Sequence, residues 1–123
     1  MNEKILVVDD EPDLLELVRD TLEMAGYTVI TASDGEEGLK SITEESPDLV
    51  ILDIKMPKID GMEVLERVRK NPLLNELPII MLTSLKGEGI IREAKEVGAN
   101  DYIVKPFNQI DLLNRVKRVI SSS

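Results

Sequence analysis

Carboxylates follow two short apolar stretches of the chain, at positions that suggest chemistry at the edge of a sheet. Leu49–Leu52 is uniformly apolar and is followed directly by Asp53. Ile5–Val8 is equally apolar and is followed by Asp9 and Asp10. Such runs indicate short strands that are buried on both faces of a parallel sheet. Carboxylates directly after these strands would lie at the carboxyl edge of the sheet, where open α/β folds bind their ligands.

Two further apolar stretches are followed by a hydroxyl and by an ammonium group. Residues 78–82 precede Thr83, and residues 101–104 precede Lys105. The carboxyl ends of parallel strands meet at one edge of a sheet, so both side chains are expected to approach Asp53. The same edge would therefore carry acidic, basic and hydroxyl groups.

These groups together predict a magnesium-dependent phosphoryl-acceptor site. Three carboxylates in one crevice repel one another, so they either take up a proton or bind a cation. Oxygen ligands suit Mg²⁺, which usually meets only one or two carboxylates and leaves another free. Asp53 is central and is the candidate nucleophile. Lys105 and the Thr83 hydroxyl would stabilise the phosphoryl oxygens.

Strands and helices alternate along the chain. Stretches 5–8, 27–32, 49–52, 78–82 and 101–104 are predicted strands, and helices are predicted from Pro12 to about Gly26 and over about 36–43, 62–71, 90–97 and 110–120. This alternation predicts an α/β fold with a doubly wound, five-stranded parallel sheet, for which we favour the strand order 2-1-3-4-5. In that order Asp9, Asp10 and Asp53 share one crevice.

Two local features of the helices can be compared directly with a structure. Pro12 suits the first turn of the first helix, with Asp10 as its N-cap. The last helix is predicted to bury one apolar stripe, formed by Ile110, Leu113, Val116 and Ile120.

The composition limits the classes of function. With 123 residues, the chain is predicted to form one domain over residues 1–123, without disulfides or metal to stabilise it. The absence of Cys and His excludes a thiolate zinc site and the commonest general base. The formal net charge of -9 argues against direct binding of nucleic acid. With no apolar run of membrane length and no signal-peptide pattern, we expect a cytoplasmic protein.

Five short motifs occur in an order and spacing that one protein family shares. They are Val8-Asp9-Asp10-Glu11, Leu52-Asp53-Ile54-Lys55-Met56-Pro57 with Asp60-Gly61, Thr83-Ser84, Gly98-Ala99-Asn100-Asp101-Tyr102, and Lys105-Pro106-Phe107. In these motifs the chain resembles the receiver domain of two-component response regulators, the family of the chemotaxis response regulator. The resemblance covers essentially the whole chain and implies the flavodoxin-like (βα)5 receiver fold.

The resemblance also implies roles for individual residues. Asp53 would accept a phosphoryl group from a phosphohistidine on a sensor histidine kinase or a phosphotransfer protein. One Mg²⁺ ion would be bound by Asp10, Asp53 and the backbone carbonyl of Lys55, with Asp9 acting through a metal-bound water. Thr83 and Lys105 would hold the phosphoryl oxygens.

Output is expected at a surface that responds to phosphorylation. By resemblance, Thr83 moves toward the phosphoryl group, Tyr102 turns inward, and the Lys105-Pro106 bond is cis. The surface of the fourth helix, fifth strand and fifth helix would then change its affinity for a partner protein or an output domain. Gly87 and Gly89 suit a mobile start of the fourth helix.

The oligomeric state stays open between a monomer and a phosphorylation-promoted dimer. Asp101 and Arg115 are spaced to pair across a symmetric dimer, as in DNA-binding members of the family. Ile90 and Ile91 interrupt the charged pattern expected on the fourth helix. These isoleucines would form an apolar patch for a partner, or at least one would belong to the core.

Three other classes of protein share parts of this pattern. A haloacid-dehalogenase-like phosphohydrolase needs an acid two residues after its nucleophile, where this chain has Lys55. In a flavodoxin, the acidic residues 9–11 would repel the flavin phosphate. A phosphorylation-independent, receiver-like interaction module would normally have lost Asp53, Thr83 or Lys105, and all three are present. We therefore expect a phosphoacceptor signalling module and no enzyme acting on other substrates.

The phosphoryl group is expected to be lost slowly. Lys55 and Leu85 follow Asp53 and Thr83 by two residues and flank the path of attacking water. Neither side chain is suited to orient that water. The sequence fits both a single-domain regulator and a receiver taken from a longer chain.

Overall fold

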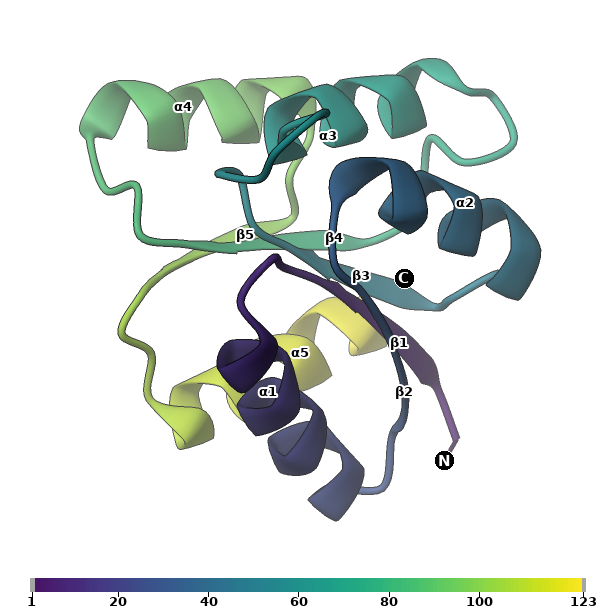
Figure 1. Cartoon of the computed structure of the whole chain (residues 1–123), viewed down its shortest axis with the longest axis vertical. Coiled ribbons are helices and arrows are strands. Elements are labelled where there is room, and N and C mark those ends of the chain that lie inside the picture. The colour runs from purple at the N-terminus through teal and green to yellow at the C-terminus, as the bar shows by residue number, and fades with distance from the viewer. Residues whose placement is uncertain (1, 123) are drawn as a thin grey trace.

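A parallel sheet forms the centre of the molecule (Figure 1). The computed structural model describes residues 2–122, and within them one sheet contains β1 (Lys4–Val8), β2 (Thr28–Ala32), β3 (Leu49–Leu52), β4 (Ile79–Thr83) and β5 (Asp101–Val104). The strands lie in the order β2-β1-β3-β4-β5, and each neighbouring pair is parallel. The predicted doubly wound sheet and its strand order are confirmed.

Helices cover both faces of the sheet (Figure 1). One face carries α1 (Pro12–Met24) and α5 (Gln109–Ser121), and the other carries α2 (Gly35–Glu45), α3 (Gly61–Lys70) and α4 (Glu88–Val97). The chain passes from β1 outward to β2 and then reverses its direction along the sheet, so right-handed crossovers place α1 on one face and α2, α3 and α4 on the other. Among the described residues, no helix is long and apolar enough to span a membrane.

The inner strands contribute to two apolar cores, one on each face of the sheet. Successive residues of a strand point to opposite faces, so a strand covered on both sides must be apolar throughout. The core beneath α2, α3 and α4 receives Leu6, Val8, Val50 and Leu52, and the core beneath α1 and α5 receives Ile5, Val7, Leu49 and Ile51. This double burial explains the uniform apolar runs that precede the carboxylates.

The prediction for the buried face of α5 is right for Val116 and wrong for Ile110. Its buried residues are Leu112, Val116 and Val119, and Ile110 is 69% exposed. Leu113 and Ile120 are only partly buried beside the same core. The predicted stripe and the buried residues are both apolar at helical spacing and share Val116. The spacing alone therefore did not determine which side of α5 faces the sheet.

The first helix starts differently from the prediction, and the second is longer. Pro12 occupies the first turn of α1 as predicted, but the N-cap is Glu11, and no side chain caps the helix. Asp10 is therefore not the N-cap. The second helix extends beyond the predicted 36–43 at both ends, and Asp34 caps its start by accepting a hydrogen bond from the Glu37 amide.

Candidate functional site

Asp9, Asp10 and Asp53 meet at the carboxyl edge of the sheet. β1 and β3 are neighbours, with Val8 opposite Leu52, and the Asp53 amide donates a 3.0 Å hydrogen bond to the Val8 carbonyl. One carboxylate oxygen from each aspartate lies within 4.8 Å of the other two. Asp9 and Asp53 are only 2% and 5% exposed, whereas Asp10 is exposed. The predicted crevice therefore contains two buried carboxylates and one accessible to solvent.

Lys105 inserts its ammonium group between these carboxylates. Its Nζ lies 2.8 Å from Asp9 Oδ2, 3.2 Å from Asp53 Oδ2 and 3.2 Å from Glu11 Oε1. The contact of Lys105 with Glu11 was not predicted from the sequence. The place of Glu11 in the same acidic run as Asp9 was the available signal.

Burial and charge act in opposite directions on these groups. Burial lowers the pKa of Lys105, but the hydrogen bond with Asp9 and the charges of Asp9 and Asp53 outweigh burial and raise it. Burial raises the pKa of Asp9, and the hydrogen bonds from Lys105 and from the Glu11 amide only partly offset this increase. The Asp53 charge adds to the increase. Lys105 is thus charged, and the carboxylates compete for it.

The donor set fits a hard divalent cation. The side chains of Asp9, Asp10, Asp53 and Glu11 bring four carboxylates to a site where, among the described residues, Lys105 supplies the ammonium group. One positive charge leaves most of this negative charge uncompensated, and the potential ligand atoms are oxygens. Carboxylate oxygens with an exposed approach through Asp10 match the preference of Mg²⁺.

Thr83, Leu85 and Tyr102 form a hydrogen-bonded series beside the site. Thr83 is fully buried at the end of β4, and its Oγ1 accepts a 3.4 Å hydrogen bond from the Leu85 amide. The Tyr102 hydroxyl donates a 2.6 Å hydrogen bond to the Leu85 carbonyl. Tyr102 is buried, facing the core beneath α4. The loop before α4 is thereby connected to both predicted switch residues.

The loop after β3 begins in contact with Asp53. The Lys55 amide donates a 3.3 Å hydrogen bond to Asp53 Oδ1. Lys55 and Asp10 also line a hollow of about 690 Å³, whose apolar wall includes Met56 and Leu85. The Lys105-Pro106 peptide bond on the other side of the site is cis, the form that the resemblance implies.

The proposed dimer pair is joined within the chain. Arg115 Nη1 lies 2.8 Å from Asp101 Oδ1, and Arg118 Nη2 lies 3.2 Å from Asp101 Oδ2. Pairing between two chains would require these contacts to exchange, so it stays a prediction. Ile90 and Ile91 are both partly buried and pack against the core beneath α4, so they lie between the two predicted roles, and the apolar patch for a partner stays a prediction.

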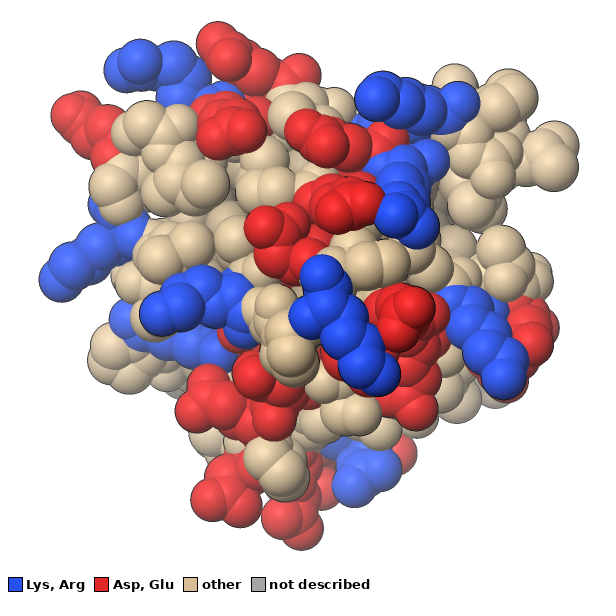
Figure 2. Space-filling model, turned by 45° about the horizontal axis from the view of Figure 1, so that its top comes forward, with Lys and Arg blue, Asp and Glu red and all other residues tan. Residues whose placement is uncertain are grey.

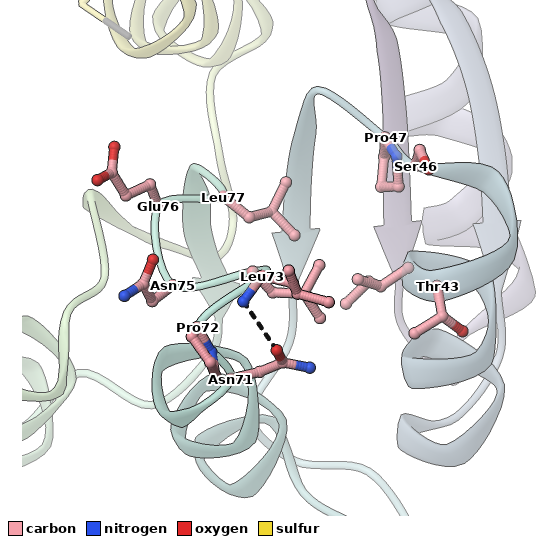
Figure 3. A pocket seen from close by; sticks show the side chains of 11 residues that line it. Thr43, Ser46, Pro47, Asn71, Pro72, Leu73, Asn75, Glu76 and Leu77 are labelled. Atoms are coloured by element: carbon pink, nitrogen blue, oxygen red, sulfur yellow. Dashed lines mark hydrogen bonds between the residues drawn. The ribbon is translucent and has the colours of Figure 1, made fainter.

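A second hollow, shown in Figure 3, lies at the opposite edge of the sheet. It measures about 670 Å³ and extends from the end of α2 to the loop before β4, with Thr43, Ser46, Asn71 and Asn75 among its polar residues. Glu76 is the charged residue among those that line it. On the face shown in Figure 2, acidic side chains are interspersed with basic ones. The hollow thus differs from the carboxyl edge, where the carboxylates of Asp9, Asp10 and Asp53 are grouped.

Comparison with known proteins agrees with the geometry. Residues 5–117 match the family model described as the response regulator receiver domain. The chain is 47% identical over 123 residues to the alkaline phosphatase synthesis transcriptional regulatory protein PhoP of Bacillus subtilis, covering all of this chain and 50% of the relative. It is 47% identical over 118 residues to the probable transcriptional regulator ycf27 of Guillardia theta, covering 96% of this chain and 45% of the relative.

Solved structures agree with the same assignment. Chemotaxis protein CheY4 of Vibrio cholerae superposes with a TM-score of 0.90 at 39% identity, covering 97% of this chain and 99% of that one. A CheY-like receiver domain protein of Methanospirillum hungatei superposes with a TM-score of 0.92 at 34% identity, covering 99% and 96%. The chain spans about half the length of the curated relatives that it matches. Its fold, its edge of carboxylates and these matches show that the chain belongs to the response regulator receiver domains of two-component signalling systems.

Proposed function

We propose that Asp53 accepts a phosphoryl group from a phosphohistidine on a sensor histidine kinase or a phosphotransfer protein. The observation that carries this proposal is the position of Asp53 at the end of β3, buried and 3.2 Å from the Lys105 ammonium. A carboxylate with a cation at this distance can react while the charge that develops on the phosphoryl oxygens is stabilised. The chain would be a signalling module that promotes its own phosphorylation and acts on no other substrate.

The transfer would be a direct displacement at phosphorus. A carboxylate oxygen of Asp53 forms the new bond to phosphorus as the bond from phosphorus to the donor imidazole nitrogen breaks. That nitrogen leaves with the electron pair, and the product is an acyl phosphate on Asp53. Lys105 would turn from its carboxylate partners to a phosphoryl oxygen, and the Thr83 hydroxyl would donate to another.

Three groups of the chain would bind one Mg²⁺ ion directly during this step, and a fourth would bind it through a water. Asp10 and Asp53 would supply carboxylate oxygens, Lys55 would supply its backbone carbonyl, and Asp9 would bind through a water. When bound, Mg²⁺ neutralises charge on the carboxylates and the phosphoryl oxygens. The excess of carboxylates over ammonium groups supports this assignment.

Phosphorylation would be transmitted through Thr83 and Tyr102 to the face of α4, β5 and α5. Movement of Thr83 toward the phosphoryl group would break its hydrogen bond with the Leu85 amide. Leu85 is also the acceptor for Tyr102, so the loop before α4 and the ring in β5 would respond together. A partner protein or an output domain senses the change only if it binds the two states with different affinities.

The output proposed for this receiver is control of transcription through a further domain or a partner. The Bacillus subtilis relative is a transcriptional regulatory protein twice as long as the stretch matched here. CheY4, which matches along nearly its full length, supports a second candidate, a single-domain regulator that acts by binding a partner. Either output would be downstream of the same phosphorylated Asp53.

Intact mass spectrometry tests the proposal. The chain is incubated with Mg²⁺ and acetyl phosphate, beside an Asp53→Asn variant and a sample without Mg²⁺. We expect the mass of one phosphoryl group in the wild type and no addition in either control. No addition to a folded wild type that binds Mg²⁺ would contradict the proposal and favour a phosphorylation-independent module. Binding of the metal is checked separately by calorimetry.

A further inference from the structure

The loop between β3 and α3 is fixed at its base by a close backbone approach. The Gly61 amide donates a 2.8 Å hydrogen bond to the Ile54 carbonyl, which closes residues 54–61 into a ring. A Cβ atom on Gly61 would lie 2.0 Å from the carbonyl oxygen of Asp53. Glycine is therefore required where this loop returns to the phosphoryl-acceptor residue.

The far side of the same loop meets the start of α2. A Cβ atom on Gly35, the first residue of α2, would lie 2.2 Å from the Ile59 carbonyl oxygen and 3.0 Å from Ile59 Cβ. The nearest atom belongs to the backbone, so no side-chain rotation can relieve the contact. Gly35 therefore lets the loop approach α2 more closely than any other residue would.

The residues beside Gly35 are themselves held in place. Asp34 accepts a 2.8 Å hydrogen bond from the Glu37 amide and fixes the first turn of α2. Lys58 Nζ lies 3.6 Å from carboxylate oxygens of both Asp34 and Glu36. These ion pairs are exposed, so they contribute little energy and mainly orient the loop. The close packing of Gly35 against Ile59 is the stronger constraint.

We propose that Gly35 is a positioning residue for the metal-binding loop, acting through Ile59. This inference rests on the proposed function, in which the loop supplies the Lys55 carbonyl to Mg²⁺. The loop is held at its base by the hydrogen bond from Gly61 to Ile54 and packs against α2 at Ile59, so displacement of Ile59 would shift the backbone between these points. The Lys55 amide also contacts Asp53 Oδ1, so a displaced loop would shift a ligand and the acceptor together.

Substitution of Gly35 by Ala should weaken the binding of Mg²⁺. The added methyl group must push Ile59 away by about 1 Å to restore an ordinary contact, and Mg²⁺ demands near-ideal octahedral geometry. Groups that support metal ligands typically change affinity by about 10-fold or more when they are altered. We expect an affinity about 10-fold weaker, together with faster amide exchange over residues 54–60 in the absence of metal.

The matched control is Gly26→Ala. Gly26 has φ 99°, so alanine is strained there, yet nothing lies within 4 Å of the added Cβ. Gly26 follows α1 at the opposite edge of the sheet, so this variant should lose stability without any change in Mg²⁺ affinity. Lys58→Asn is a second test variant, because asparagine tolerates the left-handed backbone at φ 71° but cannot pair with Asp34 and Glu36.

The inference is tested by measuring Mg²⁺ affinity with calorimetric titration, and the folding of each variant is checked by circular dichroism. Weaker binding in Gly35→Ala, a smaller decrease in Lys58→Asn and no change in Gly26→Ala would support it. The rate of phosphorylation by acetyl phosphate should recover at saturating Mg²⁺, as expected when positioning of the metal is the defect. Wild-type affinity in a folded Gly35→Ala chain would overturn the inference.

Failure of the positioning role and failure of the proposed function are separable outcomes. If Gly35→Ala does not fold, amide exchange in the metal-free wild type decides: exchange of residues 54–60 as fast as in an unfolded peptide would overturn the inference, because α2 would not be holding the loop. If the wild type itself binds no Mg²⁺, the proposed function fails before the role of Gly35 is reached. If the wild type binds Mg²⁺ and is phosphorylated while Gly35→Ala behaves identically, only the positioning role fails.

Discussion

The ammonium group of Lys105 lies 3.2 Å from a carboxylate oxygen of Asp53, joining the end of β5 to the end of β3. The same Nζ is 2.8 Å from Asp9 Oδ2. Lys105 thus contacts the same carboxylates that would bind a metal cation, and it lies close to where the phosphoryl oxygens on Asp53 would be. In the free chain it partly compensates their charge, and in the phosphorylated chain it would stabilise the product.

Replacing Lys105 by Met should separate these two effects. Removing a cation that competes for Asp9 and Asp53 should make Mg²⁺ bind more tightly, because the carboxylates keep more of their charge for the metal. Removing a group that stabilises the phosphoryl oxygens should slow phosphorylation by about 100-fold. Calorimetry and the rate of phosphorylation by acetyl phosphate measure the two effects. The control is Lys117→Met, which loses the same charge on the exposed side of α5.

Weaker Mg²⁺ binding in Lys105→Met would contradict this account of the site. So would an equal change in Lys117→Met, since it would show that net charge alone is responsible.

Replacing Lys55 by Asn and Leu85 by Glu should shorten the lifetime of the phosphoryl group. Both residues line the hollow beside the site, and neither can orient water for attack on phosphorus. A carboxylate and an amide could do so, and we expect loss of the phosphoryl group to be about 10-fold faster. Removal of the phosphodonor followed by timed mass measurements gives the rate. Lys86→Asn, an exposed neighbour of Leu85, is the control, and unchanged kinetics in the double variant would contradict the prediction.

Arg69 should contribute more to stability than Arg67, although both lie on α3. Arg69 donates hydrogen bonds of 3.0 Å to the Gly98 carbonyl, 2.8 Å to the Leu77 carbonyl and 3.0 Å to Asn100 Oδ1. Arg67 pairs with Glu63 on an exposed surface. Arg69→Met should lower the free energy of unfolding by about 2–3 kcal/mol, and Arg67→Met by less than about 0.5 kcal/mol. Urea unfolding of both variants provides the comparison, and equal losses would count against it.

Asp34 should make stability depend on pH in the acid range. The hydrogen bond from the Glu37 amide, followed by the Lys58 charge, lowers the pKa of Asp34 below its usual value of 3.8. The folded state therefore favours the ionised form, and its contribution is complete above the unfolded pKa and is lost as pH falls through the folded pKa. Asparagine would still cap α2 but would not titrate.

The stability difference between wild type and Asp34→Asn should shrink as pH is lowered from about 7 to 3. Urea unfolding across this range measures it, and Asp20→Asn on the exposed side of α1 controls for the loss of one charge. A difference that grows toward acid pH would have the wrong sign.

The sequence predicted the sheet and the crevice because both depend on local signals. Uniformly apolar runs marked the strands, and Asp53, Thr83 and Lys105 came directly after them. Once the strand order was inferred from alternation and crossover handedness, the meeting of these residues followed. The site was therefore predictable as a set of residues, while its distances were not.

Other features depend on contacts between distant parts of the chain. Arg69 contacts residues 98 and 100, and nothing in its own neighbourhood signals this. In the sequence Gly35 is an ordinary turn residue, and its close approach to the Ile59 backbone is evident only in the structure. From the sequence, Asp10 could either cap α1 or face the carboxylate crevice. In the structure Glu11 is the N-cap of α1, and Asp10 lies beside Asp9 and Asp53.

The central claim is that Asp53, among the three aspartates of the crevice, carries the phosphoryl group. Borohydride reduces an acyl phosphate to an alcohol, which converts the modified aspartate into homoserine. The chain phosphorylated with acetyl phosphate and Mg²⁺ is reduced, digested and mapped by peptide mass spectrometry. The account predicts homoserine at position 53 and unmodified aspartate at positions 9 and 10. Homoserine at Asp9 or Asp10, or none in a chain shown to have gained a phosphoryl group, would contradict it.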